Sequence, residues 1–214
     1  IARFGSGTGR ELVFNGGSLQ FSGVFDPSAI TTTINGSVTF DTQANSVTFA
    51  NPIGNGGSGS VIKSGTGTLT FAATNNYSGT TTVNAGTLTV GTGGDGTSAA
   101  QAGTIGRTGT GVTTANTSSV ITGSGFIQGS LVLNGTTLRP GDAAGASLGT
   151  LWTGSDATFT GGTLELQITA PTLNVLALAN REDPGYAAAL ATLIINPSLA
   201  SAISLSQHDH LEVG

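Results

Sequence analysis

The sequence has no cysteine and no methionine, and it has few charged side chains. The lack of cysteine excludes a disulfide framework and a thiolate metal site. Lys, Arg, Asp and Glu make up 8% of the 214 residues, against roughly 25% in an ordinary globular protein. The six basic residues are scattered singly, and the formal net charge is -5. Both features disfavour binding to the phosphate backbone of a nucleic acid or to an anionic membrane surface. We therefore expect no nucleic-acid partner.

The sequence also lacks a long apolar run. The longest, residues 187–195, is interrupted by Thr192 and is far shorter than the roughly 20 residues that a membrane-spanning helix needs. We therefore expect no direct membrane insertion. There is no initial methionine and no recognisable signal peptide, so we expect the chain to be a fragment of a longer precursor.

Glycine and short alternating apolar runs are abundant instead. Thirty-five residues are glycine, and clusters of Gly, Asn, Asp and Ser separate runs in which every second residue is apolar. A period of two with one apolar face is typical of β-strands, and helical periodicity is absent from residues 1 to about 180. The alternating sets are Leu12 and Phe14, Leu19 and Phe21, Val38 and Phe40, Val47 and Phe49, Leu69 and Phe71, Leu88 and Val90, Leu131 and Leu133, and Leu164, Leu166 and Ile168.

Internal similarity favours stacked coils over a sandwich or a closed barrel. Residues 65–71 are echoed by 84–90 and by 160–166, each with a Gly-Thr-Leu sequence at the start of an expected strand. Outward positions are mostly Thr, Ser or Asn, which can stack between coils at about 4.8 Å. The residues thus predict an all-β solenoid, a parallel β-helix, in which Leu69 and Leu88 point inward from neighbouring strands.

Residues 61–91 carry three spaced elements with many fixed positions. These are Lys63, Gly65, Gly67, Thr68 and Leu69, then Asn75, Tyr77, Gly79 and Thr81, and then Val83, Gly86, Leu88 and Val90. The stretch resembles the autotransporter-associated β-strand repeat of passenger domains in type V secreted proteins. The resemblance extends over roughly residues 11–170. It implies a right-handed, single-stranded parallel β-helix exported to the bacterial cell surface, and it leaves the anchoring mode open.

Residues 171–214 depart from the repeat. Asp183 followed by Pro184 is a helix start signal, and Asn196-Pro197 repeats it. We expect a helical insertion over 183–204 that packs on the solenoid as a flap or cap. The alternative is a docking helix for a partner or a membrane surface, but the basic face of such helices is missing. The residues that would share one helical face are Tyr186, Leu190, Leu193 and Ile194.

The acidic residues are single, whereas a glycosidase or lyase on a β-helix needs paired carboxylates or an Asp cluster for Ca²⁺. Turn chemistry accounts for three of them, which adjoin Pro or Gly, and Glu165 between two leucines is expected to face solvent. We therefore expect no catalytic residue. The positions considered are Asp26, Asp41, Asp95, Asp142, Asp156 and Glu165.

Two histidines near the end of the sequence have the spacing of a metal-ligand pair. His208 and His210 would share one face of a strand, but Asp209 would point the other way and no third ligand is evident. We expect both to be solvated. The Gly-rich sequence at 91–96 lacks the lysine and the helix that a phosphate loop needs. We therefore expect no metal ion and no cofactor.

The expected function is structural or adhesive rather than catalytic. We interpret residues 1–214 as one β-helix segment, secreted to the bacterial surface as a stalk, spacer or fibre-forming element. With roughly 20 residues per coil, ten or so coils at about 4.8 Å would extend about 50 Å. We expect end-to-end self-association or continuation into further repeats, with cell-surface or polysaccharide ligands.

Two alternative functions remain. One is a carbohydrate-active β-helix enzyme or a carbohydrate-binding surface. The other is an ice-binding face, which would need Thr-x-Thr rows in register over many coils, and the sequence has only scattered pairs. Examples of these pairs are Thr68 with Thr70 and Thr87 with Thr89.

Overall fold

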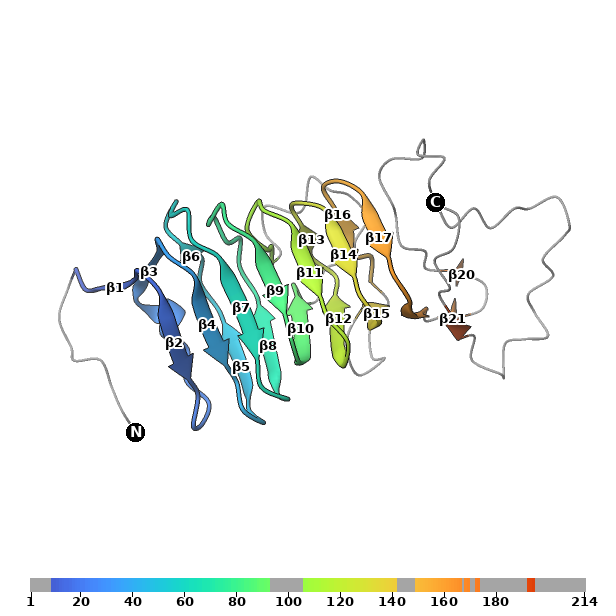
Figure 1. The fold of residues 1–214 in the computed structure, drawn as a ribbon, viewed down its shortest axis with the longest axis horizontal. Coiled ribbons are helices and arrows are strands. Elements are labelled where there is room, and N and C mark those ends of the chain that lie inside the picture. Colours follow the sequence, from blue (N-terminus) through green and yellow to red (C-terminus); the bar gives the residue numbers. More distant parts are fainter. Residues whose placement is uncertain are drawn as a thin grey trace, which may run out of the picture.

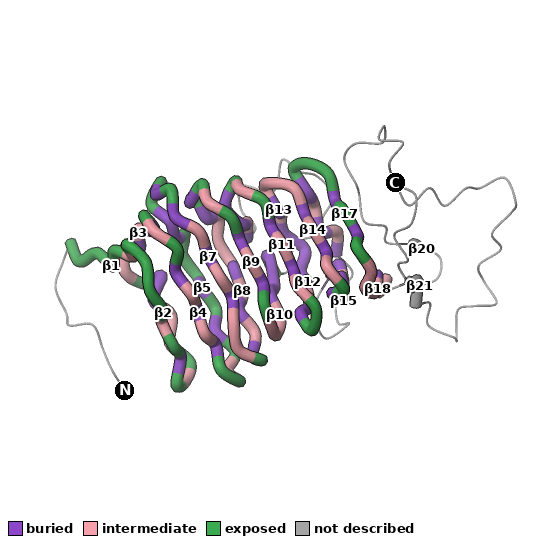
Figure 2. Tube along the Cα trace, in the orientation of Figure 1, coloured by how far each residue is buried: buried purple, intermediate pink, exposed green. Residues whose placement is uncertain are grey.

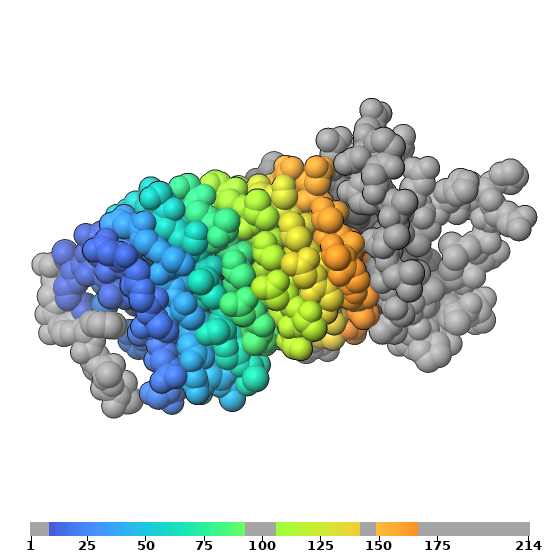
Figure 3. Space-filling model, viewed as in Figure 1, coloured from blue at the N-terminus to red at the C-terminus, as the bar shows by residue number. Residues whose placement is uncertain are grey.

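The structure is a computed structural model that describes residues 9–92, 106–141 and 149–166, together with the backbone of three short strands at 168–169, 172–173 and 192–194. The described coils form a short rod along which the chain advances steadily from blue to orange (Figure 3). Strands from successive coils lie side by side across the rod (Figure 1). The strands of successive coils pair in parallel, which confirms the parallel β-helix expected from the sequence. One isolated bridge between coils, from Gly123 to Gly141, is antiparallel. The antiparallel pair β19 (Ile168–Thr169) and β20 (Thr172–Leu173) is local.

Each coil contributes to up to three sheets, which we call faces A, B and C. Face A has short strands, joined in its middle by single bridges from Thr74 to Arg107 and from Arg107 to Phe126. Its strands are β1 (Glu11–Phe14), β3 (Thr31–Ile34), β6 (Ile53–Gly54), β13 (Phe126–Ile127) and β16 (Trp152–Thr153).

Faces B and C are continuous sheets of seven strands each. At the usual strand spacing, seven strands extend about 30 Å along the rod. Face B contains β2 (Gly17–Gln20), β4 (Val38–Asp41), β7 (Val61–Ser64), β9 (Thr81–Val83), β11 (Thr113–Ala115), β14 (Leu131–Leu133) and β17 (Ala157–Phe159). Face C contains β5 (Ser46–Phe49), β8 (Thr68–Phe71), β10 (Gly86–Val90), β12 (Ser119–Gly123), β15 (Thr136–Pro140), β18 (Gly162–Glu165) and β21 (Thr192–Ile194).

The core is a narrow column of alternate residues from all three faces. Buried and less buried residues alternate along most strands (Figure 2). Phe40 and Phe49 meet edge to face with ring centroids 5.0 Å apart, and Phe71 follows Phe49 at 6.0 Å. Leu69 and Leu88 are fully buried and directly paired between β8 and β10, which confirms the inward orientation expected for both.

Register is kept although the coils differ in length. Hydrogen bonds between equivalent positions join residues 17 to 32 apart in sequence. The longest spacing contains 93–105, outside the described residues. Extra residues are therefore accommodated between strands, where they do not shift the inward and outward alternation.

The C-terminal part differs from expectation at the three residues that the structure describes within 183–204. Thr192–Ile194 is strand β21, which pairs in parallel with β18; this corrects the expected helix at these residues. Thr192 and Leu193 continue the rows of Thr163 and Leu164, so extending the sheet satisfies their backbone groups. The remainder of 183–204 lies outside the described residues. No helix in the described ranges is long and apolar enough to cross a membrane.

Candidate functional site

Lys63 is the least expected residue of the core. It occupies an inward position of face B, between Phe40 and Val83 of the adjoining coils, and its side chain is fully buried. Its ammonium group donates to three carbonyl oxygens, those of Ser64 at 2.8 Å, Gly65 at 2.7 Å and Ala85 at 3.0 Å. The three protons of the ammonium group are therefore matched by three acceptors at the corner between faces B and C.

Burial lowers the pKa of Lys63 to about 8, and the negative charge of Asp41 opposes this shift. Sequence reasoning placed Lys63 in the repeat signature but missed its inward orientation. The available signal was alternation, because Val61 and Lys63 stand two residues apart in one strand and Val61 is apolar.

Asn75 links three successive coils on face A. Its side-chain Oδ1 accepts from the backbone N–H of Ile53 at 2.9 Å, and its Nδ2 donates to the carbonyl oxygen of Arg107 at 2.7 Å. The residue is 1% exposed. Asn75 therefore replaces backbone pairing where face A has no regular strand, because an amide both donates and accepts.

Tyr77 belongs to the hydrophobic core and is fully buried. Its hydroxyl lies 2.7 Å from Oγ1 of Thr81, which is also fully buried. Burial raises the pKa of Tyr77 to about 12, although hydrogen bonds from Thr81 and from the Gly109 backbone act in the opposite direction. The spacing of these two signature residues thus satisfies two polar groups within an apolar core.

Two signature glycines are required by geometry. Gly65 has φ +78 at the corner after Lys63, a backbone conformation that other residues rarely adopt. A Cβ on Gly79 would lie 2.2 Å from the carbonyl oxygen of Gly59 in the preceding coil. The same close approach recurs along one corner of the rod, in a column made of Gly36, Gly59, Gly79, Gly111 and Gly129.

The carboxylates of Asp26 and Asp41 accept hydrogen bonds from different turn residues. Asp26 caps the short 3₁₀ helix η1 (Pro27–Ala29), accepting from the N–H and hydroxyl of Ser28 and from the N–H of Ala50. This confirms its expected turn role. Asp41 accepts from the backbone N–H of Gln43, which with the Gln20 side chain holds the pKa of Asp41 below its usual range.

The remaining acidic and histidine candidates are less informative. Asp156 is exposed, and its carbonyl oxygen accepts from the N–H of Leu131. Within the described ranges, no three His, Cys, Asp or Glu residues are grouped as a metal site would require. The candidates Asp95, Asp142, His208 and His210, together with Asp183, lie outside the described residues.

Face C carries the threonine rows considered as an ice-binding array. Ser46, Thr68 and Thr87 are in register in one row, and Thr48, Thr70 and Thr89 in the next. The rows continue into Val120 and Thr122, and then into Thr137 and Arg139. Thr89 is 6% exposed and Thr122 is fully buried. Within the described rows, threonine therefore occupies both positions in two coils only, those of β8 and β10.

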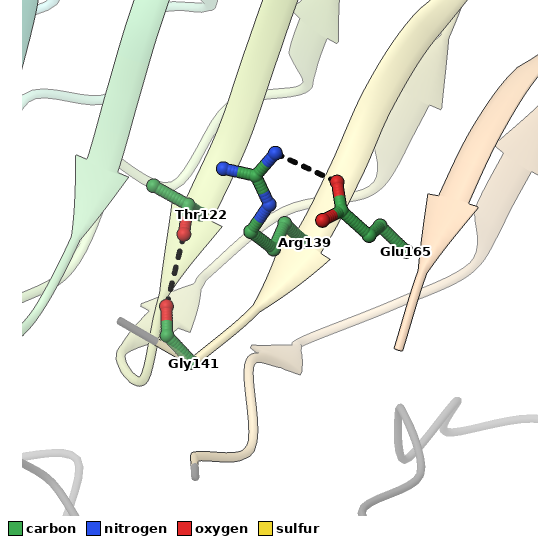
Figure 4. A network of polar contacts seen from close by, with 4 residues as sticks. All are labelled: Thr122, Arg139, Gly141 and Glu165. Atoms are coloured by element: carbon green, nitrogen blue, oxygen red, sulfur yellow. Dashed lines mark hydrogen bonds and ion pairs between the residues drawn. The ribbon is translucent and has the colours of Figure 1, made fainter. Parts of the chain in front are cut away.

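Figure 4 shows the end of the second row. Thr122 donates to the carbonyl oxygen of Gly141 at 2.9 Å. Arg139 and Glu165 form an ion pair at 2.6 Å on neighbouring strands, and both side chains are about one-third exposed or less. Glu165 is thus on the outward side, as expected, but it is paired with Arg139 across the strands. A surface pair of this kind contributes little to stability.

Comparison with known proteins gives a match in the stretch that carries the repeat signature, residues 61–91. One family model, described as Passenger-associated-transport-repeat, matches residues 61–90. No curated protein and no solved structure matches the chain significantly. The matched residues contain the three features described above, namely the Lys63 corner, the Asn75 bridge and the Tyr77–Thr81 pair. Residues 61–90 are therefore a repeat of the passenger-associated transport type, which supports the resemblance of this stretch to the repeats of autotransporter passenger proteins.

Proposed function

We propose that this chain is a secreted structural element of a bacterial surface, which acts as a rigid stalk or spacer and presents an adhesive side face. The observation that carries the proposal is the uninterrupted parallel register of faces B and C over seven strands each. A stack of this kind lengthens in proportion to its number of coils, because each coil contacts only its neighbours. The passenger-type repeat supports a secreted or surface location.

The side faces support an adhesive rather than a catalytic role. The middle outward row of face B is uncharged throughout, and its side chains are half-buried or exposed. Its members are Ser18, Thr39, Ile62, Thr82, Thr114, Val132 and Thr158. The described carboxylates Asp26 and Asp41 are engaged by neighbouring turn residues, which does not favour the alternative of a carbohydrate-active enzyme.

Insertion of complete coils tests the spacer role. Val61 pairs with Thr81, so residues 61–80 form one complete coil that can be duplicated without changing register. Three extra copies are expected to lengthen the rod by about 14 Å. Small-angle X-ray scattering of the purified protein measures this length, and energy transfer from a terminal label to the membrane measures it on displaying cells.

A flexible Gly/Ser insert of equal residue number is the control, because such a chain behaves as a random coil. The spacer proposal requires the coil insert, unlike the Gly/Ser insert, to give a fixed increase in length. If both inserts changed the maximum dimension equally, the solenoid would not be acting as a rigid spacer.

End-to-end association is part of the proposal. Among the residues that the structure describes, β1 and β2 are the outermost strands at one end of faces A and B, and Phe14 and Leu19 at this end are only partly buried. Open strand edges next to apolar side chains favour addition of another coil. Sedimentation velocity over a wide concentration range is the test, and a strictly monomeric protein would contradict self-association.

A further inference from the structure

A polar groove of about 380 Å³ lies against η1 and face A, near the N-terminal end of the described rod. Three successive coils contribute to it. Ser28 and Ala29 come from η1, Thr31 from β3, Asn51 and Pro52 from the next corner, and Asn55 and Asn76 from the turns after that. The volume falls in the range of small-molecule binding pockets, and it has room for about one or two sugar rings.

The exposed side chains of the groove retain unused hydrogen-bonding groups. Asn55 uses its Nδ2 to donate to Thr33, which leaves its Oδ1. Asn76 uses its Oδ1 to accept from the N–H of Gly56, which leaves its Nδ2. The side chains of Asn51 and Thr31 make no hydrogen bond within the described part of the chain. The groove thus offers donors and acceptors side by side, as hydroxyl-rich ligands require.

Charge restricts the ligand further. No residue that lines the groove is charged. The carboxylate of Asp26, just before η1, is engaged by Ser28 and Ala50, and that of Glu11 accepts from Thr33. The lining therefore offers no basic side chain to an anionic ligand and no carboxylate to a cationic one. A neutral ligand is therefore favoured.

The groove is preorganised and partly apolar. Asn55 is held at φ 42 in a turn closed by the bond from the Gly57 N–H to the Gly54 carbonyl, 2.7 Å. Exposed Pro52 and Ala29 supply apolar surface beside the amides, against which the C–H face of a pyranose ring can pack. Groups already fixed in the free protein lose less entropy on binding.

We infer that this groove binds a neutral glycan, with Asn51, Asn55 and Asn76 bonding to the sugar hydroxyls. The inference rests on the proposed function, because it names the ligand class of the adhesive side face. Few direct hydrogen bonds and an open groove give weak affinity per site, with dissociation constants of about 1 mM. Repetition of such segments on one cell surface would raise the overall avidity.

Nuclear magnetic resonance titration of the ¹⁵N-labelled full chain tests the inference. The neutral probes are lactose, cellobiose, maltose and N,N′-diacetylchitobiose, which separate galactosides, glucans and amino sugars. A sulfated heparin disaccharide is the charged probe. We expect at least one neutral probe to shift the side-chain amide signals of Asn51, Asn55 and Asn76, and the heparin disaccharide to leave them unchanged.

Substitutions test whether the sugar binds in the groove. Asn51→Ala and Asn76→Ala are each expected to weaken binding about two- to tenfold, the effect of one lost hydrogen bond. Asn84→Ala is the matched control, because Asn84 is an exposed asparagine that accepts from Asn116 at a different corner. Its affinity is expected to stay unchanged, and preserved backbone spectra show that each variant is folded.

The inference is overturned if no neutral probe shifts the three amides near the solubility limit of the sugars, or if Asn84→Ala weakens binding as much as Asn76→Ala. Preferential binding of the heparin disaccharide also overturns it. The length measurement after coil insertion does not depend on sugar binding. The spacer role can therefore be supported even if the titration finds no glycan site. If coil insertion fails while sugar binding is found, the groove is retained and the spacer role is lost.

Discussion

Lys63 and Ala85 are joined across the coil boundary by a 3.0 Å hydrogen bond from the ammonium group to the carbonyl oxygen. The same nitrogen holds the carbonyl oxygens of Ser64 and Gly65 in its own coil. Lys63 thus begins at an inward position between Phe40 and Val83, and its ammonium group lies at the corner. There it connects two coils by hydrogen bonds. Long side chains of this kind bury the aliphatic stem and keep the charged end among polar groups.

The stability of the fold is expected to rise with pH through the titration of Lys63. Its pKa is about 8 in the fold against an ordinary 10.5, so between these values the unfolded chain binds more protons than the folded one. The free energy of unfolding therefore increases over this window by a few kcal/mol, with an upper limit of about 3–4 kcal/mol, and the increase is lost again as the pH falls through about 8. Urea unfolding at several pH values measures it.

The variant Lys63→Met tests whether Lys63 causes this dependence of the unfolding free energy on pH. The variant keeps an unbranched apolar stem but removes the titrating group, so its stability should not rise between pH 8 and 10. Ile62→Met is the control, because Ile62 is the adjacent, partly exposed residue on the outward side. An unchanged slope in Lys63→Met would mean that another group is responsible.

Tyr77 is expected to act in the opposite direction at higher pH. Its pKa is raised from 10.0 to about 12 by burial, so its contribution to stability is complete below about pH 10 and is lost as the pH rises towards 12. Tyr77→Phe should abolish this loss. At neutral pH it should lower stability by about 0.5–1.5 kcal/mol, because Thr81 loses its partner.

Unfolding of the two proteins between pH 9 and pH 11, together with the ultraviolet absorbance of the phenolate, checks the assignment to Tyr77. Thr81→Ser keeps a hydroxyl at the partner position and is the matched variant, expected to retain the pH dependence. A Tyr77 side chain that ionised near 10 in the folded protein would contradict the buried environment.

Sequence reasoning identified those strands of faces B and C in which two apolar inward residues stand two positions apart, such as β4 with Val38 and Phe40 and β8 with Leu69 and Phe71. Strands such as β11 (Thr113–Ala115) were not identified, because their inward residues are not both large and apolar. The spacing of the echoed Gly-Thr-Leu segments was enough to place Leu69 beside Leu88, as the register confirms. On face A the alternation of Leu12 and Phe14 indicated β1, but strands such as β6 (Ile53–Gly54) were missed, because they have two residues and show no period. Face A is also where the glycan groove lies.

Interactions between distant residues were beyond the reach of the sequence. Asn75 joins Ile53 and Arg107, which lie 22 and 32 residues away, and nothing local to Asn75 indicates those partners. Thr89 and Thr122 occupy outward rows yet are buried, because alternation gives the side of a sheet but not what covers it. At Thr192–Ile194 local helix signals were outweighed by pairing with β18.

Truncation of the paired core leucines is expected to be costly. Leu69→Ala and Leu88→Ala should each lower the free energy of unfolding by about 2–5 kcal/mol, because both side chains are fully buried and little can collapse into the space. Thr70→Ala, on the outward side of the same strand, should change it by less than about 0.5 kcal/mol. Chemical denaturation measures all three, and equal penalties would contradict the assignment of the strand faces.

The glycine column is the most demanding feature of the rod, and Gly79→Ala tests it. The added methyl group would lie 2.2 Å from the carbonyl oxygen of Gly59 and 2.6 Å from Oγ of Ser60. The backbone cannot yield without separating two coils whose N–H and carbonyl groups bond at 3.2 Å, so we expect a loss of about 1–3 kcal/mol or more.

Gly23→Ala is the matched control for Gly79→Ala. A Cβ on Gly23 would meet no atom within 4 Å, and its φ lies outside the left-handed range. Alanine there restricts the unfolded chain without strain in the fold, so stability should be unchanged or should increase by about 0.4–1 kcal/mol. Thermal and urea unfolding measure the stability of both variants. If Gly79→Ala were as stable as Gly23→Ala, the coils could separate at this corner, and contact between glycine backbones would not set their spacing.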